Sequence, residues 1–93
     1  MNAKAKGTRA EHRSIRLFEA AGYLCTRAAA SLGVWDIIAV SSADIIFCQV
    51  KTRDWPSCAE REQMRRFPAP PYARKIIHRY RRGVKLPDVQ EVE

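Results

Sequence analysis

The sequence predicts an α/β protein in which helices flank one mixed β-sheet, in the order helix, three strands, helix, strand. Three observations support this fold class: apolar residues recur at helical spacing near the N-terminus, two short apolar runs are separated by a tight turn, and a second helical segment precedes a basic strand. The chain has 93 residues, which is room for one domain. We therefore expect a single domain over residues 1–93, with the small and basic residues 1–7 flexible.

The first helix is expected over residues 8–21. The four residues from Thr8 to Glu11 fit a capping box, and Gly22 is a natural stop. Ile15 and Phe18 share a face with Glu11, so the Glu11 carboxylate is expected to point toward the sheet. Two roles are open for Glu11 from this spacing alone, as a helix cap or as part of an active site.

The strands alternate with turn signals along the rest of the chain. Strands two and three are close in sequence and should pair as an antiparallel hairpin, and both are apolar on both faces, which is typical of central strands. The expected strands cover residues 23–28, 34–40, 45–52 and 74–82, with a helix over residues 57–67 capped by Ser57 and a possible edge strand over residues 89–92.

Composition restricts the class of protein. The net charge is +7 and the isoelectric point about 9.8, which favours a polyanionic partner, although charge alone can also serve solubility. Cys25, Cys48 and Cys58 form no Cys-x-x-Cys pair, so a disulfide framework or zinc site is not expected. Without a signal peptide or an apolar stretch long enough to span a bilayer, the chain is expected to be soluble and cytoplasmic, in a reducing compartment.

Asp36 is the main anomaly of the apolar strands, because a buried carboxylate is costly unless it is paired or binds a metal ion. The period of a strand places Phe47, Gln49 and Lys51 on one face of the next strand. Normal pairing of the hairpin brings Asp36 beside Gln49, so a carboxylate oxygen, an amide oxygen and an ammonium group meet at one spot.

This set of side chains suits the hydrolysis of a phosphodiester bond. Oxygen ligands favour Mg²⁺ or Mn²⁺, which polarises a phosphate and acidifies a bound water. Lys51 can hold the attacking water or neutralise charge that develops on the phosphate, and Glu11 is placed to reach the metal ion directly or through water. The candidate catalytic residues are therefore Glu11, Asp36, Gln49 and Lys51, with Asp36, Gln49 and Glu11 as metal ligands.

The chain resembles the PD-(D/E)xK nuclease superfamily, and within it the archaeal-type Holliday junction resolvases. The resemblance implies metal-dependent cleavage of branched DNA by a homodimer, with Glu11, Asp36 and Lys51 catalytic and with Arg27 and Ser31 near the scissile phosphate. The motifs that carry it cover about half of the chain and lie in family order: Lys6-Gly7, Glu11, Gly22-Tyr23, Thr26-Arg27, Ala30-Ser31, Gly33, Asp36-Ile37-Ile38-Ala39 and Gln49-Val50-Lys51-Thr52.

Three positions depart from the family pattern. Gln49 replaces the usual glutamate, His12 follows Glu11 where resolvases tend to have arginine, and Trp35 stands where a proline usually precedes the aspartate. The glutamine also leaves open a DNA-binding module that no longer cuts. We expect Gln49→Glu to tighten metal binding without destroying the fold, because the two side chains have nearly the same shape.

Structural readings remain open for several of these residues. Asp36 could pair with Arg27, Lys51 could be a solvated strand end, and Ser31 with Gly33 could form only a tight turn. The favoured interpretation is a Mg²⁺-dependent endonuclease that acts on branched DNA as a junction resolvase. The alternative is another nuclease of the superfamily, of restriction, repair or homing type. The residues expected to bind DNA are Arg9, Arg13, Arg27, Ser31 and Arg53.

Overall fold

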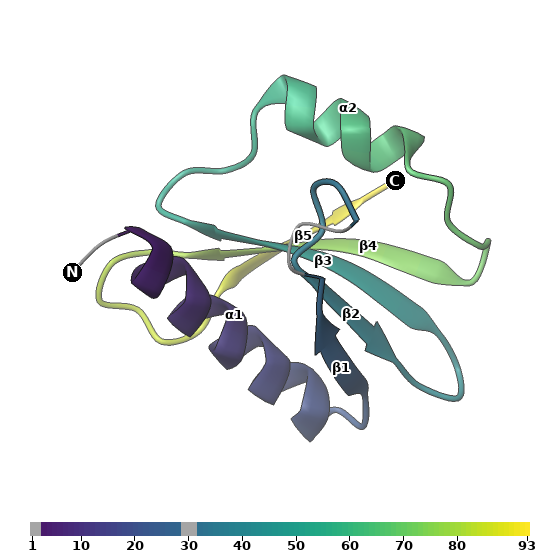
Figure 1. Cartoon of the computed structure of the whole chain (residues 1–93), viewed down its shortest axis with the longest axis horizontal. Helices are drawn as coiled ribbons and strands as arrows, with labels where there is room; N and C mark the ends of the chain where they lie inside the picture. The colour runs from purple at the N-terminus through teal and green to yellow at the C-terminus, as the bar shows by residue number, and fades with distance from the viewer. Residues whose placement is uncertain (1–2, 29–31) are drawn as a thin grey trace.

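One five-stranded sheet forms the centre of the molecule, with the strands in the order β1-β2-β3-β4-β5 (Figure 1). The structure is a computed structural model that describes residues 3–28 and 32–93. The elements are α1 (Ala3–Ala20), β1 (Leu24–Arg27), β2 (Ile37–Val40), β3 (Ile45–Thr52), α2 (Cys58–Arg66), β4 (Ala73–Tyr80) and β5 (Asp88–Val92). This architecture confirms the predicted fold class and order of elements.

The two helices cover opposite faces of the sheet, α1 below and α2 above in the view of Figure 1. The hairpin of β2 and β3 is antiparallel as predicted, with Ile37 opposite Cys48 and Val40 opposite Ile45. Strands β3 and β4 are parallel, and α2 forms the crossover between them. The sheet is therefore mixed, and its central strand β3 has apolar layers on both sides.

Each face of the sheet has its own hydrophobic core, because side chains of a strand alternate between the faces. On the α1 side, Phe18 packs with Ile37, Ile46 and Cys48. On the α2 side, the core is formed by Trp35, Phe47, Met64 and Ile77. The alternation along β3 therefore directs Gln49 and Lys51 toward α2.

The first helix begins earlier than the sequence predicted. It starts at Ala3, so residues 3–7, expected to be flexible, are helical, and Thr8 lies inside the helix instead of capping it. Of the two roles left open for Glu11, the structure therefore excludes the helix cap. The helix ends at Ala20 before Gly22, whose φ of 97° is a conformation that glycine adopts at little cost.

The second strand is shorter than predicted, beginning at Ile37 and not at residue 34. Asp36 consequently precedes the strand, and its side chain takes a hydrogen bond from the backbone of β3. This side-chain acceptor replaces regular strand pairing at the point where β2 begins.

Helix α2 is fixed at both ends. Ser57 and Glu60 form a capping box, in which the Ser57 hydroxyl accepts from the Glu60 backbone and the Glu60 carboxylate accepts from the Ser57 backbone. At the other end, the Lys75 ammonium donates to the carbonyls of Arg65 and Phe67, as expected for a cation at a helix C-terminus. None of the helices in the described part of the chain has the length and apolarity needed to cross a bilayer.

Arg53 directly follows β3 and has a left-handed backbone conformation, with φ of 84°, and its N–H donates to the Tyr80 carbonyl at 3.0 Å. A side chain at such a position is strained, whereas glycine is not. We expect Arg53→Gly to be about 1 kcal/mol more stable than Arg53→Ala, since both variants lose the side chain and only alanine keeps the strain. Urea unfolding of the two variants measures this difference, and equal stabilities would contradict it.

Candidate active site

Asp36 lies at the mouth of the β2–β3 hairpin, held by three hydrogen bonds. Its N–H donates to the Cys48 carbonyl at 2.9 Å, and its carbonyl accepts from the Ala28 N–H at 2.8 Å. Its carboxylate oxygen Oδ2 accepts from the Val50 N–H at 2.8 Å. The backbone of three neighbouring segments therefore fixes both the residue and its carboxylate.

The environment of Asp36 disfavours its negative charge. The pKa of Asp36 is raised to about 6, mainly by burial and also by the nearby Glu11 charge, against the opposing effects of the Val50 hydrogen bond, Lys51 and Arg27. A nearby cation would stabilise the charged form of such a carboxylate, because the cation offsets the free-energy cost of burying the negative charge.

Gln49 is the next component, and it is only 5% exposed. Its position on β3 is one step beyond the last β2–β3 pair, Ile37 with Cys48, on the side where Asp36 enters the hairpin. Its amide nitrogen Nε2 donates to Glu60 Oε2 at 3.2 Å, while its amide oxygen Oε1 is buried without a hydrogen-bond partner. An unpartnered buried acceptor is unfavourable in the free protein and suits a cation ligand.

Lys51 lies on the same face of β3 as Gln49, as the sequence predicted. Its ammonium Nζ is 3.6 Å from Glu60 Oε1. Glu60 thus contacts both Gln49 and Lys51, and its pKa is lowered mainly by the hydrogen bond from the Ser57 backbone.

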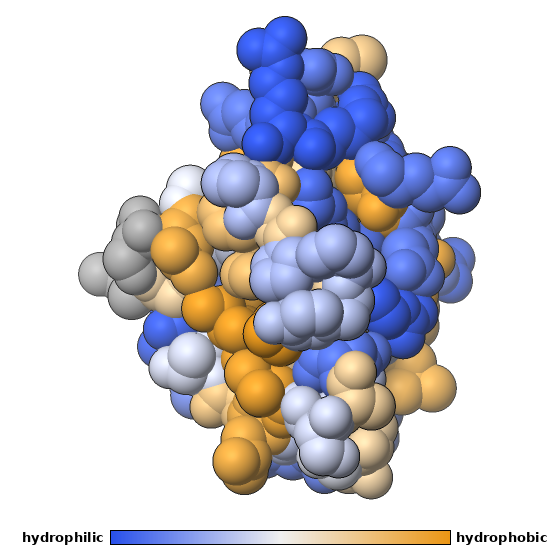
Figure 2. Space-filling model, turned by 90° about the vertical axis from the view of Figure 1, so that its right-hand side faces the viewer, coloured by the Kyte–Doolittle hydropathy of each residue, from blue (hydrophilic) through white to orange (hydrophobic). Residues whose placement is uncertain are grey.

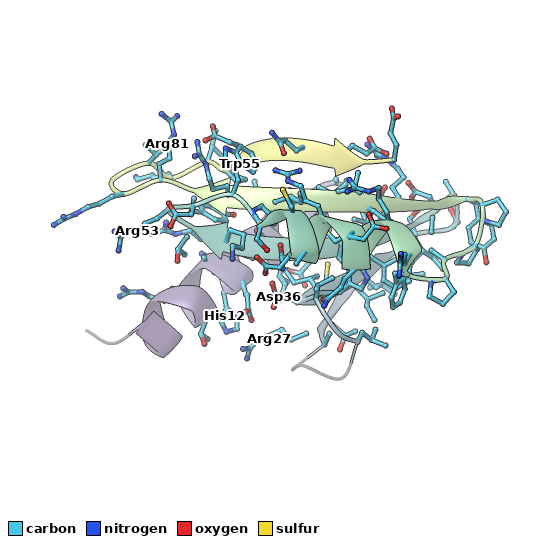
Figure 3. All side chains as sticks on the ribbon, turned by 90° about the horizontal axis from the view of Figure 1, so that it is seen from above. His12, Arg27, Asp36, Arg53, Trp55 and Arg81 are labelled. Carbon is cyan, nitrogen blue, oxygen red and sulfur yellow. The ribbon has the colours of Figure 1, made fainter. Side chains whose placement is uncertain are left out.

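Glu11 enters from the other face of the sheet and binds Arg27. The Glu11 Oε1 and Arg27 Nε atoms are 2.9 Å apart. Arg27 therefore pairs with Glu11 and not with Asp36, the pairing considered from the sequence. Figure 3 shows Asp36, Arg27 and His12 in the same part of the molecule.

The donors at this site fit a hard divalent cation. They are the Asp36 carboxylate and the orphaned Oε1 of Gln49, with Glu11 close enough for its charge to act on Asp36. Among residues 3–28 and 32–93, no three His, Cys, Asp or Glu side chains gather as a metal site. That result is compatible with these donors, because the position of one expected carboxylate is occupied by an amide.

Basic residues form a pocket next to this site, at the end of β3. The pocket adjoins Thr52 and has a volume of about 150 Å³. Arg9 and Arg13 of α1 line it together with Arg81 and Arg82 from the turn after β4. Two of the arginines expected to bind DNA are therefore in one concave basic surface.

The remaining predicted DNA-binding residues are placed separately. Arg27 is engaged with Glu11, and Arg53 lies with Trp55 and Arg81 at one end of the molecule in Figure 3. Ser31 lies outside the described residues. Most of the arginines in α2, in β4 and in the turn after β4 are paired with acidic residues: Arg65 and Arg66 with Glu62, Arg74 with Glu91, and Arg79 and Arg81 with Asp88.

Reasoning from the sequence missed Glu60, and it placed Arg82 at the end of the basic strand expected over residues 74–82, whereas β4 ends at Tyr80. The spacing of Ser57 and Glu60 is a capping-box signal that could have identified Glu60 as a fixed carboxylate, but not its contacts with β3. Arg82 lies beside Gly83, whose φ of 78° marks a turn, and this turn returns the chain toward α1.

Comparison with known proteins supports the fold. No protein-family model and no curated protein sequence matches the chain. Among solved structures, the Holliday junction resolvase of the hyperthermophilic archaeon Archaeoglobus fulgidus is similar, with a TM-score of 0.75 and 24% sequence identity. The match covers 94% of this chain and 73% of that one, so the two chains share a fold over nearly the whole length of this protein.

Proposed function

We propose that the protein is a divalent-metal-dependent endonuclease that hydrolyses phosphodiester bonds of branched DNA, as a Holliday junction resolvase. One observation carries the proposal: the Asp36 carboxylate and the unpartnered Gln49 oxygen lie at the mouth of one hairpin, with the Lys51 ammonium on the same face of β3 as Gln49. The similar fold of a resolvase supports the choice of substrate.

The side chains would divide the reaction between them. A bound Mg²⁺ or Mn²⁺ would supply Lewis acidity toward the phosphate and a more acidic water. Asp36, Gln49 and Glu11 would hold that ion, and Lys51 would orient the attacking water or stabilise charge on the phosphate oxygens. The water oxygen forms the new bond to phosphorus, one ester P–O bond breaks, and the leaving oxygen takes up a proton.

Cleavage of labelled four-way-junction, flapped and linear duplex DNA tests this proposal. We expect Mg²⁺-dependent cuts in the junction that stop when EDTA is added. Binding of junction DNA without any cleavage in Mg²⁺ or Mn²⁺ would instead indicate a DNA-binding module that no longer cuts, the role that the missing carboxylate at Gln49 favours.

The basic pocket beside Thr52 is proposed to hold a backbone phosphate of the DNA. Each phosphate contact releases counterions, so removing one lowers affinity and flattens its salt dependence. We expect Arg13→Ala and Arg82→Ala each to weaken DNA binding and to reduce the slope of log affinity against log salt by about 1. Fluorescence anisotropy measures both.

Arg66→Ala is the matched control for these variants, because Arg66 is exposed and paired with Glu62 in α2 (Nε to Oε1, 2.9 Å). It should leave the salt slope nearly unchanged. An equal loss of slope in the control would show that the pocket has no special role and that binding reflects total charge.

We also propose that the protein acts as a homodimer. A junction is cut in two strands, and a two-fold dimer supplies two equivalent sites. Figure 2 shows apolar residues gathered over part of one face of the molecule. At the β2–β3 turn, Val40, Ile45 and Tyr72 line a hollow, and the side chains of Val40 and Tyr72 are exposed there. Light scattering that finds a monomer, both free and on junction DNA, would count against the resolvase role but not against nuclease chemistry.

A further inference from the structure

The orientation of the Gln49 amide follows from the chemistry of its neighbour. A carboxylate only accepts hydrogen bonds, so the end of the amide that faces Glu60 must be its NH₂ group. The distance of 3.2 Å from Gln49 Nε2 to Glu60 Oε2 fits this contact. The amide oxygen is thereby turned away from Glu60 and left without a partner in the protein interior.

Glu60 is itself held in place by its own helix. Its Oε1 accepts from the Ser57 N–H at 3.0 Å, and its N–H donates to the Ser57 hydroxyl at 3.1 Å. Lys51 Nζ lies 3.6 Å from the same Oε1 atom. The two oxygens of the carboxylate therefore make different contacts. Oε1 caps α2 and faces Lys51, while Oε2 accepts the hydrogen bond from the Gln49 amide.

We propose that Glu60 is a positioning residue of the active site, which holds Gln49 with its amide oxygen directed to the divalent cation. The inference rests on the proposed nuclease function. It explains how an uncharged side chain can serve where the resemblance predicts a glutamate. The negative charge is on Glu60, which binds the amide of Gln49, instead of on residue 49 itself. Glu60 also places its negative charge beside the Lys51 ammonium. The site therefore has the same number of charges as a site with a glutamate at position 49.

A purely structural role for Glu60 makes a different prediction from the positioning role. The capping box uses only Oε1, and the amide oxygen of Glu60→Gln can accept the same hydrogen bond from Ser57. The NH₂ group of that variant, however, would face the NH₂ group of Gln49, and two donors cannot bond to each other. The substitution therefore keeps the helix cap and removes the hold on Gln49.

Binding of Mn²⁺ alone, measured by calorimetry on the full chain, tests the inference without relying on cleavage. We expect Glu60→Gln to weaken Mn²⁺ affinity by about 10- to 100-fold, the usual cost of losing a group that orients a metal ligand. Its unfolding midpoint in urea should stay close to that of the wild type. Glu62→Gln is the matched control, since Glu62 lies two residues away in α2 and pairs with Arg65 and Arg66.

The exchanged pair, Gln49→Glu with Glu60→Gln, provides the rescue. It places the carboxylate on β3 and the amide on α2, so the same contact forms with donor and acceptor reversed. We expect this double variant to recover Mn²⁺ affinity to at least the wild-type value.

Wild-type affinity in Glu60→Gln, or a double variant that binds no better than Glu60→Gln, would overturn the positioning role while leaving Asp36-dependent cleavage intact. A wild-type protein that neither binds Mn²⁺ nor cuts DNA would overturn the proposed function, and the positioning role with it.

Discussion

Asp36→Asn is expected to lower the rate of DNA cleavage by about 10²- to 10³-fold, the range found when a group that stabilises charge in a reaction is removed. The reason is that, among the described residues, Asp36 is the only carboxylate at the mouth of the hairpin without an ion-pair partner. Glu11, the other candidate carboxylate, is already bound to Arg27. DNA affinity should change little, because Asp36 makes no part of the basic pocket. Single-turnover cleavage of a junction, with anisotropy for binding, measures the two effects separately.

Measuring the stability of Asp36→Asn excludes the explanation that the variant loses activity because it unfolds. The asparagine oxygen can still accept from the Val50 N–H, and the buried charge is gone. Because burial raises the pKa of Asp36 to about 6, we expect the variant to be more stable at pH 7 by about 2 kcal/mol, after discounting for the partial exposure of the side chain. A stable variant that cuts at the wild-type rate would remove Asp36 from the active site.

The second large effect concerns His78, which is expected to make the fold sensitive to acid. His78 is 5% exposed, stacks on Phe18 and contacts the fully buried Ser14 hydroxyl (Nδ1 to Oγ, 2.8 Å). Burial lowers the pKa of His78 to about 4 from its usual 6.5. The unfolded chain therefore binds more protons than the native protein between these values, and this contribution to stability falls as pH drops from 6.5 to 4.

Asp36 acts in the opposite direction over nearly the same range. Its pKa is about 6 in the native protein and 3.8 in the absence of the fold, so the native protein binds more protons, and stability falls as pH rises through this window. The two contributions, about 3 kcal/mol for His78 and about 2 for Asp36, largely cancel in the wild type. A variant that removes one of the two groups should therefore show the pH dependence of stability that the remaining group causes.

Urea unfolding between pH 4 and pH 7, with EDTA to exclude metal ions, checks this prediction. Relative to the wild type, Asp36→Asn should gain about 2 kcal/mol as pH rises, and His78→Gln should lose about 3 kcal/mol over the same range. Comparing differences between proteins removes the contribution of the surface carboxylates, which all three share. Parallel curves for the three proteins would show that neither group is perturbed by the fold.

Local patterns in the sequence predicted the strands well where clear turn signals bound them. Strand β3 has the predicted bounds, Ile45–Thr52, because a turn precedes it and Trp55-Pro56 follows it. The prediction was wrong at the N-terminal end of α1. Thr8 and Glu11 match a capping box, yet the helix continues N-terminal to Thr8, and the Glu11 carboxylate instead binds Arg27, which lies on β1.

The candidate site was predictable in its members on one hairpin but not in the contacts that cross the fold. Asp36, Gln49 and Lys51 follow from strand period and register, which are local properties. The contacts of Glu60 depend on how α2 packs over β3, and no spacing in the chain encodes that packing. They also change the expectation for Gln49→Glu, because the single variant would set two carboxylates in contact, so its tighter metal binding should come with a lower metal-free stability.

The hydrogen bond from the Val50 N–H to the Asp36 carboxylate gives this protein an internal spectroscopic probe. The proton of that amide lies in the central strand β3, and its acceptor is the Asp36 carboxylate, whose pKa is raised to about 6 by burial. Its chemical shift should move when Asp36 takes up a proton, and again when a cation withdraws charge from the carboxylate. A single backbone resonance would thus report the protonation of Asp36 and, under the proposed function, the binding of a metal ion to it, in the unmodified protein, without substrate and without a label at the site.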